Sequence, residues 1–305
     1  MKILVTGGAG FIGSHVVDGY VADGNEVIVI DNLSRGKKEN INTHARFFQL
    51  DIRDPKIEEI FKSEMPEVVN HHAAQIDVRK SVEEPLCDAE ANILGTINLL
   101  QNCHKFQVKR ILFASSGGAI YGEQKMFPAS EDHQVASLSP YGISKLAGEN
   151  YLFYYKAVHN MSYLSLRYAN VYGPRQDPYG EAGVVAIFAQ KLLQGQQPVI
   201  NGDGKQTRDY VYIDDVVEAN RIALQNNYCG EINIGTGVET TVNEIFKILV
   251  EITETDISET HGPPKPGEQR RSCLDCSLAE KVLGWRPKTE LQEGLRRTVE
   301  SFREK

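Results

Sequence analysis

Cysteine and long apolar runs are scarce in this sequence of 305 residues. The five cysteines stand at irregular spacing, so no disulfide framework is indicated, and the one close pair, Cys273 and Cys276, lacks the second Cys or His pair of a zinc site. No apolar run approaches the ~20 residues that would span a bilayer, and the first residues already form an expected strand rather than a signal peptide. We expect a protein of the reducing cytoplasm, without membrane contact and without a bound metal.

Positive charge is not in excess either. The chain carries 33 Lys and Arg against 41 Asp and Glu, a net charge of −8, and the basic residues are scattered, which argues against nucleic acid as the main partner. His71 and His72 lack a third ligand, so buried histidines are predicted rather than a metal site. With 41% hydrophobic content, the chain can form one nucleotide-binding domain and a smaller dependent one.

A glycine-rich turn follows the first apolar run, residues 3–5. Gly7, Gly10 and Gly13 stand three residues apart. This spacing suits a tight turn, close approach of backbone N–H groups to a pyrophosphate, and close packing of the following helix on the strand. The pattern predicts the phosphate-binding turn of a dinucleotide site.

A second apolar run, residues 27–30, ends in Asp31. This is the distance at which a carboxylate accepts the hydroxyls of the adenosine ribose. Asp31 would repel a 2′-phosphate, so NAD is favoured over NADP, although Arg35, Lys37 and Lys38 could weaken that repulsion. The structural alternative for Asp31 is an Asx turn with Asn32.

Tyr141 and Lys145 share a helix face at i and i+4, with Ser116 at the end of an earlier expected strand. An ammonium near the phenol would favour the phenolate, so the pKa of Tyr141 is predicted to fall below its ordinary value of about 10. A base, its activator and a hydroxyl partner together indicate hydride-transfer chemistry. A surface helix turn is the alternative for Tyr-x-x-x-Lys alone.

Short apolar runs alternate with helical stretches in the first half, which predicts a parallel sheet covered by helices on both faces. Strands are expected near 47–50, 67–70, 110–115 and 162–167, and helices over 88–106 and 141–158. Right-handed crossovers place the strand ends along one crevice. The residues expected at that crevice are Gly7, Asp31, Asp51, Ala73 and Ser116.

After about residue 170 the chain becomes rich in glycine and proline turns, which predicts a second lobe that faces the substrate. We expect a dinucleotide-binding domain over 1–169 and mainly a substrate lobe over 170–305, with a segment of about 205–235 returning to the first domain. Thr241 and Glu244 form a predicted capping box before an apolar helix.

In this order, the glycine turn, Asp31, Asn92, Ser116, Tyr141 with Lys145, and the segments 167–170 and 202–215 resemble the extended short-chain dehydrogenase/reductases, most closely the UDP-glucose 4-epimerases. The resemblance covers nearly the whole chain. It implies an α/β fold: a Rossmann-type doubly wound parallel sheet with a smaller α/β substrate-binding lobe. It also implies an isomerase of galactose metabolism that binds NAD, takes a UDP-sugar as its partner, and forms a homodimer through two helices of the first lobe.

The resemblance further implies roles for single residues. Tyr141 takes the proton of the sugar 4-hydroxyl as hydride passes to NAD⁺, Ser116 hydrogen-bonds that oxygen, and Lys145 binds the nicotinamide ribose. The implied cofactor-binding residues are Gly7, Gly10, Phe11, Ile12, Gly13, Asp31, Asn32, Ser34, Gly36, Asp51, Ile52, Ala73, Ala74, Gln75, Asn92, Tyr141, Lys145 and Tyr168.

On the substrate side, the family usually has Arg-Pro-Gly-Asp where this chain has Lys265-Pro-Gly-Glu268. Lys cannot make a bidentate contact to phosphate, so Arg270 or Arg271 could have taken over that role. Ser272 stands where a bulky side chain can close the pocket beside the sugar 2-substituent, so the N-acetylated UDP-sugars are expected as further substrates. The implied substrate-binding residues are Ser116, Tyr141, Asn170, Val184, Arg208, Lys265, Glu268, Arg270 and Ser272.

Three other functions are weighed. A nucleotide-sugar dehydratase or decarboxylase needs an acidic residue just after the active-site hydroxyl, where this chain has Gly117 and Gly118. A UDP-glucuronate 4-epimerase uses the same chemistry, and Arg175 could meet the extra carboxylate. A non-catalytic NAD-binding sensor is allowed by the fold but does not need Tyr141 or Lys145.

Overall fold

A seven-stranded parallel sheet forms the centre of the computed structural model, which describes residues 1–179, 183–265 and 269–303. The strand order is β10-β6-β5-β4-β1-β2-β3, and every neighbouring pair is parallel. The predicted strands and the Rossmann-type fold are confirmed. The strands are β1 (Lys2–Thr6), β2 (Glu26–Asp31), β3 (Arg46–Gln49), β4 (Val68–His71), β5 (Arg110–Ser116), β6 (Ser162–Tyr168) and β10 (Gly230–Ile234).

Helices cover both faces of this sheet, so its strands are buried on both sides. Ile3 and Val5 of β1 point to the core shared with α1 (Phe11–Ala22) and α9 (Ile213–Gln225). Leu4 points to the opposite core, which contains side chains of α2 (Ile57–Glu64), α5 (Gly95–Lys105) and α7 (Pro140–His159). The alternation along β1 therefore fixes which helices pack on which face. The first lobe also contains α3 (Val78–Glu83), α4 (Pro85–Ala89), α6 (Gly117–Ile120) and a 3₁₀ turn, Lys38–Asn40.

The two predicted helices differ in how well they match. α7 extends the predicted span by one residue at each end, because Ser139 caps it by accepting a hydrogen bond from the N–H of Gly142 and Asn160 ends it in the left-handed conformation. The helix predicted over 88–106 begins at Pro85 and ends at Lys105, and its middle is a π-helical turn. A π-helical turn, Glu90–Leu94, separates α4 from α5 and turns the side chain of Asn92 inward.

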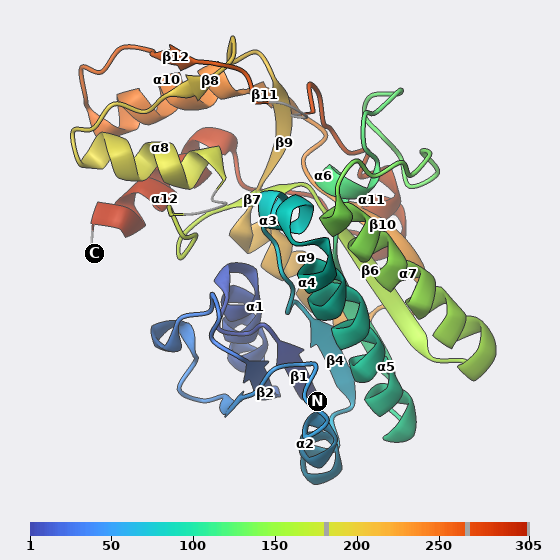
Figure 1. The fold of residues 1–305 in the computed structure, drawn as a ribbon. Coiled ribbons are helices and arrows are strands. Elements are labelled where there is room, and N and C mark those ends of the chain that lie inside the picture. The colour runs from blue at the N-terminus through green and yellow to red at the C-terminus, as the bar shows by residue number, and fades with distance from the viewer. Residues whose placement is uncertain (180–182, 266–268, 304–305) are drawn as a thin grey trace.

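The second lobe lies apart from the sheet, at the top left of Figure 1. Its capping box is confirmed, since the Thr241 hydroxyl accepts from the N–H of Glu244 and the Glu244 carboxylate accepts from that of Thr241. Its three-stranded sheet has the order β11-β9-β7 and its two-stranded sheet pairs β12 with β8. The elements are β7 (Asn170–Tyr172), α8 (Val184–Leu193), β8 (Ile200–Asn201), β9 (Thr207–Tyr212), β11 (Glu239–Thr241), α10 (Val242–Thr253), β12 (His261–Gly262) and α12 (Leu291–Arg303), with α11 (Ser277–Leu283) lying beside β10.

The chain returns from the second lobe to the first before it leaves again. α9 packs on α1, where Tyr20 donates a hydrogen bond to the carbonyl of Asn220 and Arg221 forms an ion pair with Asp23. β10 then pairs with β6 at the edge of the large sheet. Across the described ranges, no helix is both long enough and apolar enough to cross a membrane.

Candidate active site

The carboxyl ends of β1, β2 and β4 meet at one edge of the large sheet. The N–H of Gly7 donates to the carbonyl of Ile30 at 2.8 Å, and that of His72 donates to the carbonyl of Thr6 at 3.0 Å. Gly7 has a φ of +70°, and a Cβ there would lie 2.6 Å from the backbone nitrogen of Ala73. The glycine at position 7 is therefore needed both for the turn and for the approach of the segment after β4.

The amino end of α1 opens toward the same edge. Gly10 is its N-cap and offers no side-chain cap, and the first turn, Phe11 to Gly13, holds no acidic residue. A Cβ at Gly13 would lie 2.2 Å from the carbonyl oxygen of Gly7, whereas one at Gly10 would meet only that oxygen, at 3.2 Å. The N–H groups at this end lack a side-chain acceptor, and the space before them would be narrowed by a side chain at position 10. Such an arrangement fits a pyrophosphate.

Asp31 ends β2 and is buried, which raises the pKa of its carboxyl group. Its two oxygens accept from the N–H groups of Ala9, at 3.0 Å, and Leu33, at 2.8 Å. The Asx turn weighed as an alternative is therefore present, but its closing N–H is that of Leu33. Gly36 lies against this carboxylate, since a Cβ there would come within 2.8 Å of Oδ1. Asp31 thus ties the glycine turn to the loop after β2, and its remaining lone pairs are available to hydroxyl donors.

The residues predicted around the adenine lie at the ends of β2 and β3, but two of them, Asn32 and Asp51, already hydrogen-bond to other side chains of this chain. Asp51 accepts two hydrogen bonds from the guanidinium of Arg53 and one from Asn32, at 2.8 Å, which holds the pKa of Asp51 well below its usual range. Ile52 is buried against Gly95 of α5. Ser34 donates its N–H to Asn32 in the exposed loop after β2.

Asn92 does not point at open space, as a direct cofactor contact would. Its amide oxygen accepts from the N–H of Gln75 at 2.8 Å, and its amide nitrogen donates to the Gln75 carbonyl at 2.9 Å. Asn92 therefore holds the main chain of Gln75, at the end of the segment Ala73–Gln75, by two hydrogen bonds. Its effect on a cofactor would therefore be indirect, through the position of that segment.

Ser116, Tyr141 and Lys145 come together at the end of β5, as predicted. Ser116 is the last residue of β5, and its hydroxyl is hydrogen-bonded to that of Tyr141 in the first turn of α7. The Nζ atom of Lys145 donates to the carbonyl of Ala114 at 2.8 Å and lies 5.9 Å from the centroid of the Tyr141 ring. The residue Tyr141 as a whole is half-buried.

The predicted fall in the pKa of Tyr141 is wrong. Burial raises the pKa of Tyr141 to about 12, and the hydrogen bond with Ser116 opposes this only in part. Burial also lowers the pKa of Lys145 to about 8, against the nearby carboxylates of Asp88 and Glu149. The reason for the error is that spacing on a helix shows proximity but not desolvation, which dominates here.

Tyr168 lies beside Ser116 in the large sheet, and Asn170, two residues later, begins β7 of the three-stranded sheet. Tyr168 is level with Ser116 in the β5–β6 pairing, its hydroxyl accepts from Asn220 at 2.8 Å, and its ring stacks on His72. The amide oxygen of Asn170 lies 3.3 Å from the place of a Cβ at Gly118. A Cβ at Gly117 would lie 2.5 Å from Leu274. A side chain at position 117 would therefore collide with Leu274, whereas one at position 118 would need only a small shift of Asn170.

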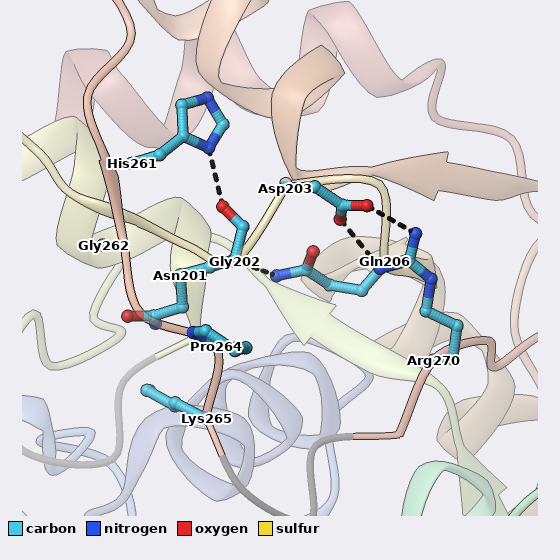
Figure 2. Close-up of a pocket in the computed structure, with 9 residues that line it drawn as sticks. All are labelled: Asn201, Gly202, Asp203, Gln206, His261, Gly262, Pro264, Lys265 and Arg270. Atoms are coloured by element: carbon cyan, nitrogen blue, oxygen red, sulfur yellow. Dashed lines mark hydrogen bonds and ion pairs between the residues drawn. The ribbon is translucent and has the colours of Figure 1, made fainter.

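The predicted substrate residues of the second lobe are more widely distributed. Lys265 and Arg270 line a cavity of about 780 Å³, which none of the catalytic residues lines (Figure 2). Arg270 is paired there with the Asp203 carboxylate at 2.8 and 2.9 Å. Arg271 is paired with Glu239 and lies over the ring of Phe127. Val184 begins α8, Arg208 lies in β9 and donates to the carbonyl of Thr207, Ser272 is buried, and Glu268 lies outside the described residues.

The burial predicted for His71 is confirmed, but the hydrogen-bond partners in two groups of buried polar residues at the site were missed from the sequence. Thr6, His71 and Thr96 form a hydrogen-bonded chain, with Thr6 Oγ1 to His71 Nδ1 at 2.7 Å and His71 Nε2 to Thr96 Oγ1 at 3.0 Å. Asp88 accepts a hydrogen bond from Ser144, between Tyr141 and Lys145. Neither belongs to a short motif, and only the apolar run before His71 indicated burial.

The parallel sheet, the open helix end beside Gly10 and the Ser–Tyr–Lys group together define a Rossmann-type enzyme of the short-chain dehydrogenase/reductase kind. Residues 3–235 match the NAD dependent epimerase/dehydratase family. The chain belongs to this family, whose description names the cofactor predicted from the glycine turn and Asp31.

Individual relatives are similar over the whole chain. The UDP-glucose 4-epimerase of Mycolicibacterium smegmatis is 45% identical over 100% of this chain and 99% of its own length. The structure of the UDP-glucose 4-epimerase of Thermotoga maritima with UDP-glucose is 53% identical, with a TM-score of 0.98, covering 100% of this chain and 99% of that one. A UDP-N-acetylglucosamine 4-epimerase of Methanobrevibacter ruminantium is 36% identical, with a TM-score of 0.95, covering 99% and 98%.

Proposed function

We propose that this chain is an NAD-dependent isomerase that interconverts UDP-glucose and UDP-galactose at C4. The observation that carries the proposal is the Tyr141–Ser116 hydroxyl pair at the edge that holds the nucleotide turn, with glycine at positions 117 and 118. The pair can handle a proton on a sugar oxygen, and no acid follows it to expel water or carbon dioxide. The similarity to UDP-glucose 4-epimerases over full length supports the same substrate class.

The cofactor and the catalytic residues have separate roles in the proposed reaction. NAD, when bound, supplies a hydride acceptor that later returns the hydride. Tyr141 would act as its phenolate, a form that the ammonium of Lys145 favours. The phenolate would take the proton of the C4 hydroxyl as C4 loses hydride, so a 4-keto sugar is left, and the phenol would give the proton back once the keto sugar has turned over. Ser116 would hydrogen-bond the C4 oxygen in both steps, and Lys145 would bind the nicotinamide ribose.

The cofactor is proposed to lie along the strand ends, with its pyrophosphate at Gly7, Gly10 and the first turn of α1. Asp31 would accept the adenosine ribose hydroxyls. The loop residues Asn32, Ser34 and Gly36 and the segment Asp51–Ile52 would enclose the adenine end. Ala73 to Gln75, held by Asn92, and Tyr168 would shape the middle of the site.

The nucleotide end of the substrate is proposed to lie against the second lobe. The cavity beside Lys265 and Arg270 has the size for a diphosphate, and Lys265 brings a positive charge to it, whereas the charge of Arg270 is paired with Asp203. Asn170, Val184, Arg208 and Glu268 are the further predicted substrate contacts, and the first three do not line this cavity. This division makes 1–169 the NAD-binding domain and 170–305 mainly the UDP-sugar lobe, with about 205–235 returning. α9 and β10 support that return, whereas β9 pairs within the second lobe.

UDP-N-acetylglucosamine and UDP-N-acetylgalactosamine are proposed as additional substrates, because position 272 carries a small serine. Ser272 is buried, so Ser272→Tyr must either fill space toward the sugar or displace its neighbours. We expect it to lower kcat/KM for the N-acetylated pair while sparing UDP-galactose, with an unchanged melting temperature. Equal losses for both pairs would contradict this role of Ser272.

The UDP-glucuronate alternative is weaker in this structure. Arg175 donates to the Ser14 hydroxyl at 3.1 Å and pairs with Asp18 at 2.7 Å, both on α1. Its charge therefore already has a partner. The sensor alternative is tested by the catalytic assay below.

A homodimer in the cytoplasm is proposed as the working form. Ile143, Tyr151, Tyr154 and Val158 form an exposed stripe along α7 at helical spacing. Leu86 of α4 and Leu94 of the neighbouring π-helical turn are also exposed, and both of these elements pack beside α7. An apolar face of this kind is typical of a subunit interface.

The direct test is proton NMR of the anomeric region after mixing the protein, NAD⁺ and UDP-galactose. UDP-glucose should appear without accumulation of NADH, and Tyr141→Phe should abolish its appearance while NAD is still bound. Unchanged UDP-galactose, UDP-glucuronate and N-acetylated sugars would together overturn the proposal in favour of a sensor.

A further inference from the structure

Asp88 is a buried carboxylate at the site to which the proposed mechanism gives no role. It lies in α4 and is 1% exposed. It accepts hydrogen bonds from Ser144 Oγ at 2.6 Å, Gln75 Nε2 at 3.0 Å and Asn92 Nδ2 at 3.0 Å. These donors come from α7, the segment after β4 and the π-helical turn, so one carboxylate joins three parts of the site.

The bond to Ser144 fixes the turn of α7 on which the catalytic residues stand. Ser144 is buried and immediately precedes Lys145, three residues after Tyr141. On the other side of the carboxylate, Asn92 holds the main chain of Gln75. Displacement of Asp88 would therefore move the base and the expected cofactor segment relative to each other.

Asp88, whose hydrogen-bond donor Ser144 immediately precedes Lys145, is also one of two nearby carboxylates that raise the pKa of Lys145, the other being Glu149. The three donors to Asp88 are uncharged, whereas both oxygens of Glu149 accept from the guanidinium of Arg167, at 3.0 and 2.7 Å. The carboxylate of Asp88 therefore leaves more of its charge uncompensated than that of Glu149. The titratable groups that face Lys145 are Asp88 from α4, Glu149 and Tyr141 from α7, and His71 and His72 from the end of β4, whose own pKa values are lowered by burial and by Lys145.

We propose that Asp88 is a positioning residue that keeps Lys145 in its ammonium form and holds the α7 turn between Tyr141 and Lys145 in register with the segment Ala73–Gln75. The effect of Asp88 on catalysis rests on the proposed function. The effect of its charge on the protonation of Lys145 does not, because it concerns only residues of this chain.

The test compares Asp88→Asn with wild type by ¹⁵N NMR of lysine-labelled, ligand-free protein, with the Lys145 Nζ signal assigned by its loss in Lys145→Arg. Asparagine keeps the size and one acceptor oxygen but removes the charge. Removal of a negative charge disfavours the ammonium, so the titration midpoint of Lys145 should fall by about one pH unit. Glu90→Gln is the matched control, because it removes an exposed carboxylate two residues away and should leave the midpoint unchanged.

The activity arm separates this inference from the proposed function. In an active enzyme, Asp88→Asn should move the alkaline limb of the kcat profile to lower pH in step with the Lys145 midpoint. A wild type that does not epimerise any UDP-sugar tells against the proposed function, while the NMR comparison still decides the charge effect. The same Lys145 midpoint in Asp88→Asn and wild type would overturn the inference.

A second variant covers the case in which Asp88→Asn does not fold. Ser144→Ala keeps the carboxylate but removes its tie to α7. We expect the Lys145 midpoint to stay near that of wild type and kcat to fall about tenfold, with KM for the UDP-sugar little changed, because only alignment is lost. A Ser144→Ala enzyme with wild-type kcat would overturn the positioning role.

Discussion

The nucleotide edge of the large sheet and the cavity of the second lobe are built in different ways. At the edge, the shape is set by the main chain: Gly7 and Gly13 let backbone atoms approach to distances that a Cβ would block. In the cavity, it is set by long exposed side chains, such as Arg270 held by Asp203. Substitutions of Gly7 or Gly13 should therefore lower stability as well as cofactor binding, whereas those in the cavity should affect substrate affinity alone.

The largest effect is expected at the proposed proton acceptor beside this edge of the sheet. Tyr141→Phe removes the proton acceptor and keeps the ring, so kcat should fall by at least about 10³-fold, with NAD affinity and stability near wild type. The NMR assay of UDP-galactose turnover, together with NAD titration, measures both quantities. Tyr154→Phe, which changes an exposed tyrosine on the same helix, should keep full activity. Retained turnover in Tyr141→Phe would remove Tyr141 from the mechanism.

The next effect tests the rigidity of the edge. Gly7→Ala places a Cβ 2.6 Å from the backbone of Ala73 at a φ of +70°, so stability should fall by about 3 kcal/mol or more. Gly24→Ala has a similar φ, +76°, but nothing within 4 Å, so its loss should be only about 1 kcal/mol. Denaturant unfolding compares the two. Equal losses would show that close approach at Gly7 contributes nothing.

A third change separates binding from folding at the same turn. Gly10→Ala meets only the Gly7 carbonyl oxygen, at 3.2 Å, and its φ is an ordinary −79°. Stability should change by less than about 1 kcal/mol, while NAD affinity should fall about tenfold, because the new methyl group narrows the space before α1. Calorimetric titration with NAD measures this. Unchanged affinity would mean that the pyrophosphate does not approach Gly10.

The smallest effect is expected in the cavity. Arg270→Gln should raise KM for UDP-galactose about fivefold with kcat unchanged, the mark of a contact made equally in the ground and transition states. Because Arg270 is exposed and ion-paired, its loss should not lower stability measurably. Arg286→Gln, which breaks another exposed pair, with Glu280, serves as the control. If Lys265→Gln rather than Arg270→Gln raises KM, the diphosphate is held by Lys265.

The same division explains what the sequence could predict. The glycine turn can be predicted because Gly7, Gly10 and Gly13 follow a local spacing. The strand ends can be predicted because apolar runs such as 27–30 are local too, and they do not depend on which side chains make contact in the folded protein. The partners of Asn92, Asp51 and Arg270 depend on side chains that come from other elements, so the sequence shows their type but not their engagement. Asp88 was missed for this reason, and the pKa of Tyr141 was predicted in the wrong direction because burial is a property of the assembled site.

The return of β10 to the large sheet limits how the two lobes can be separated. β6 lies between β5 and β10, and its side chains Leu164 and Leu166 are fully buried. A fragment cut at residue 169 would leave β6 as an open edge with unpaired N–H and C=O groups along a strongly apolar strand, which invites association with other chains. The cofactor half of this protein is thus not a detachable module, because the polypeptide that completes its sheet is made only after much of the second lobe.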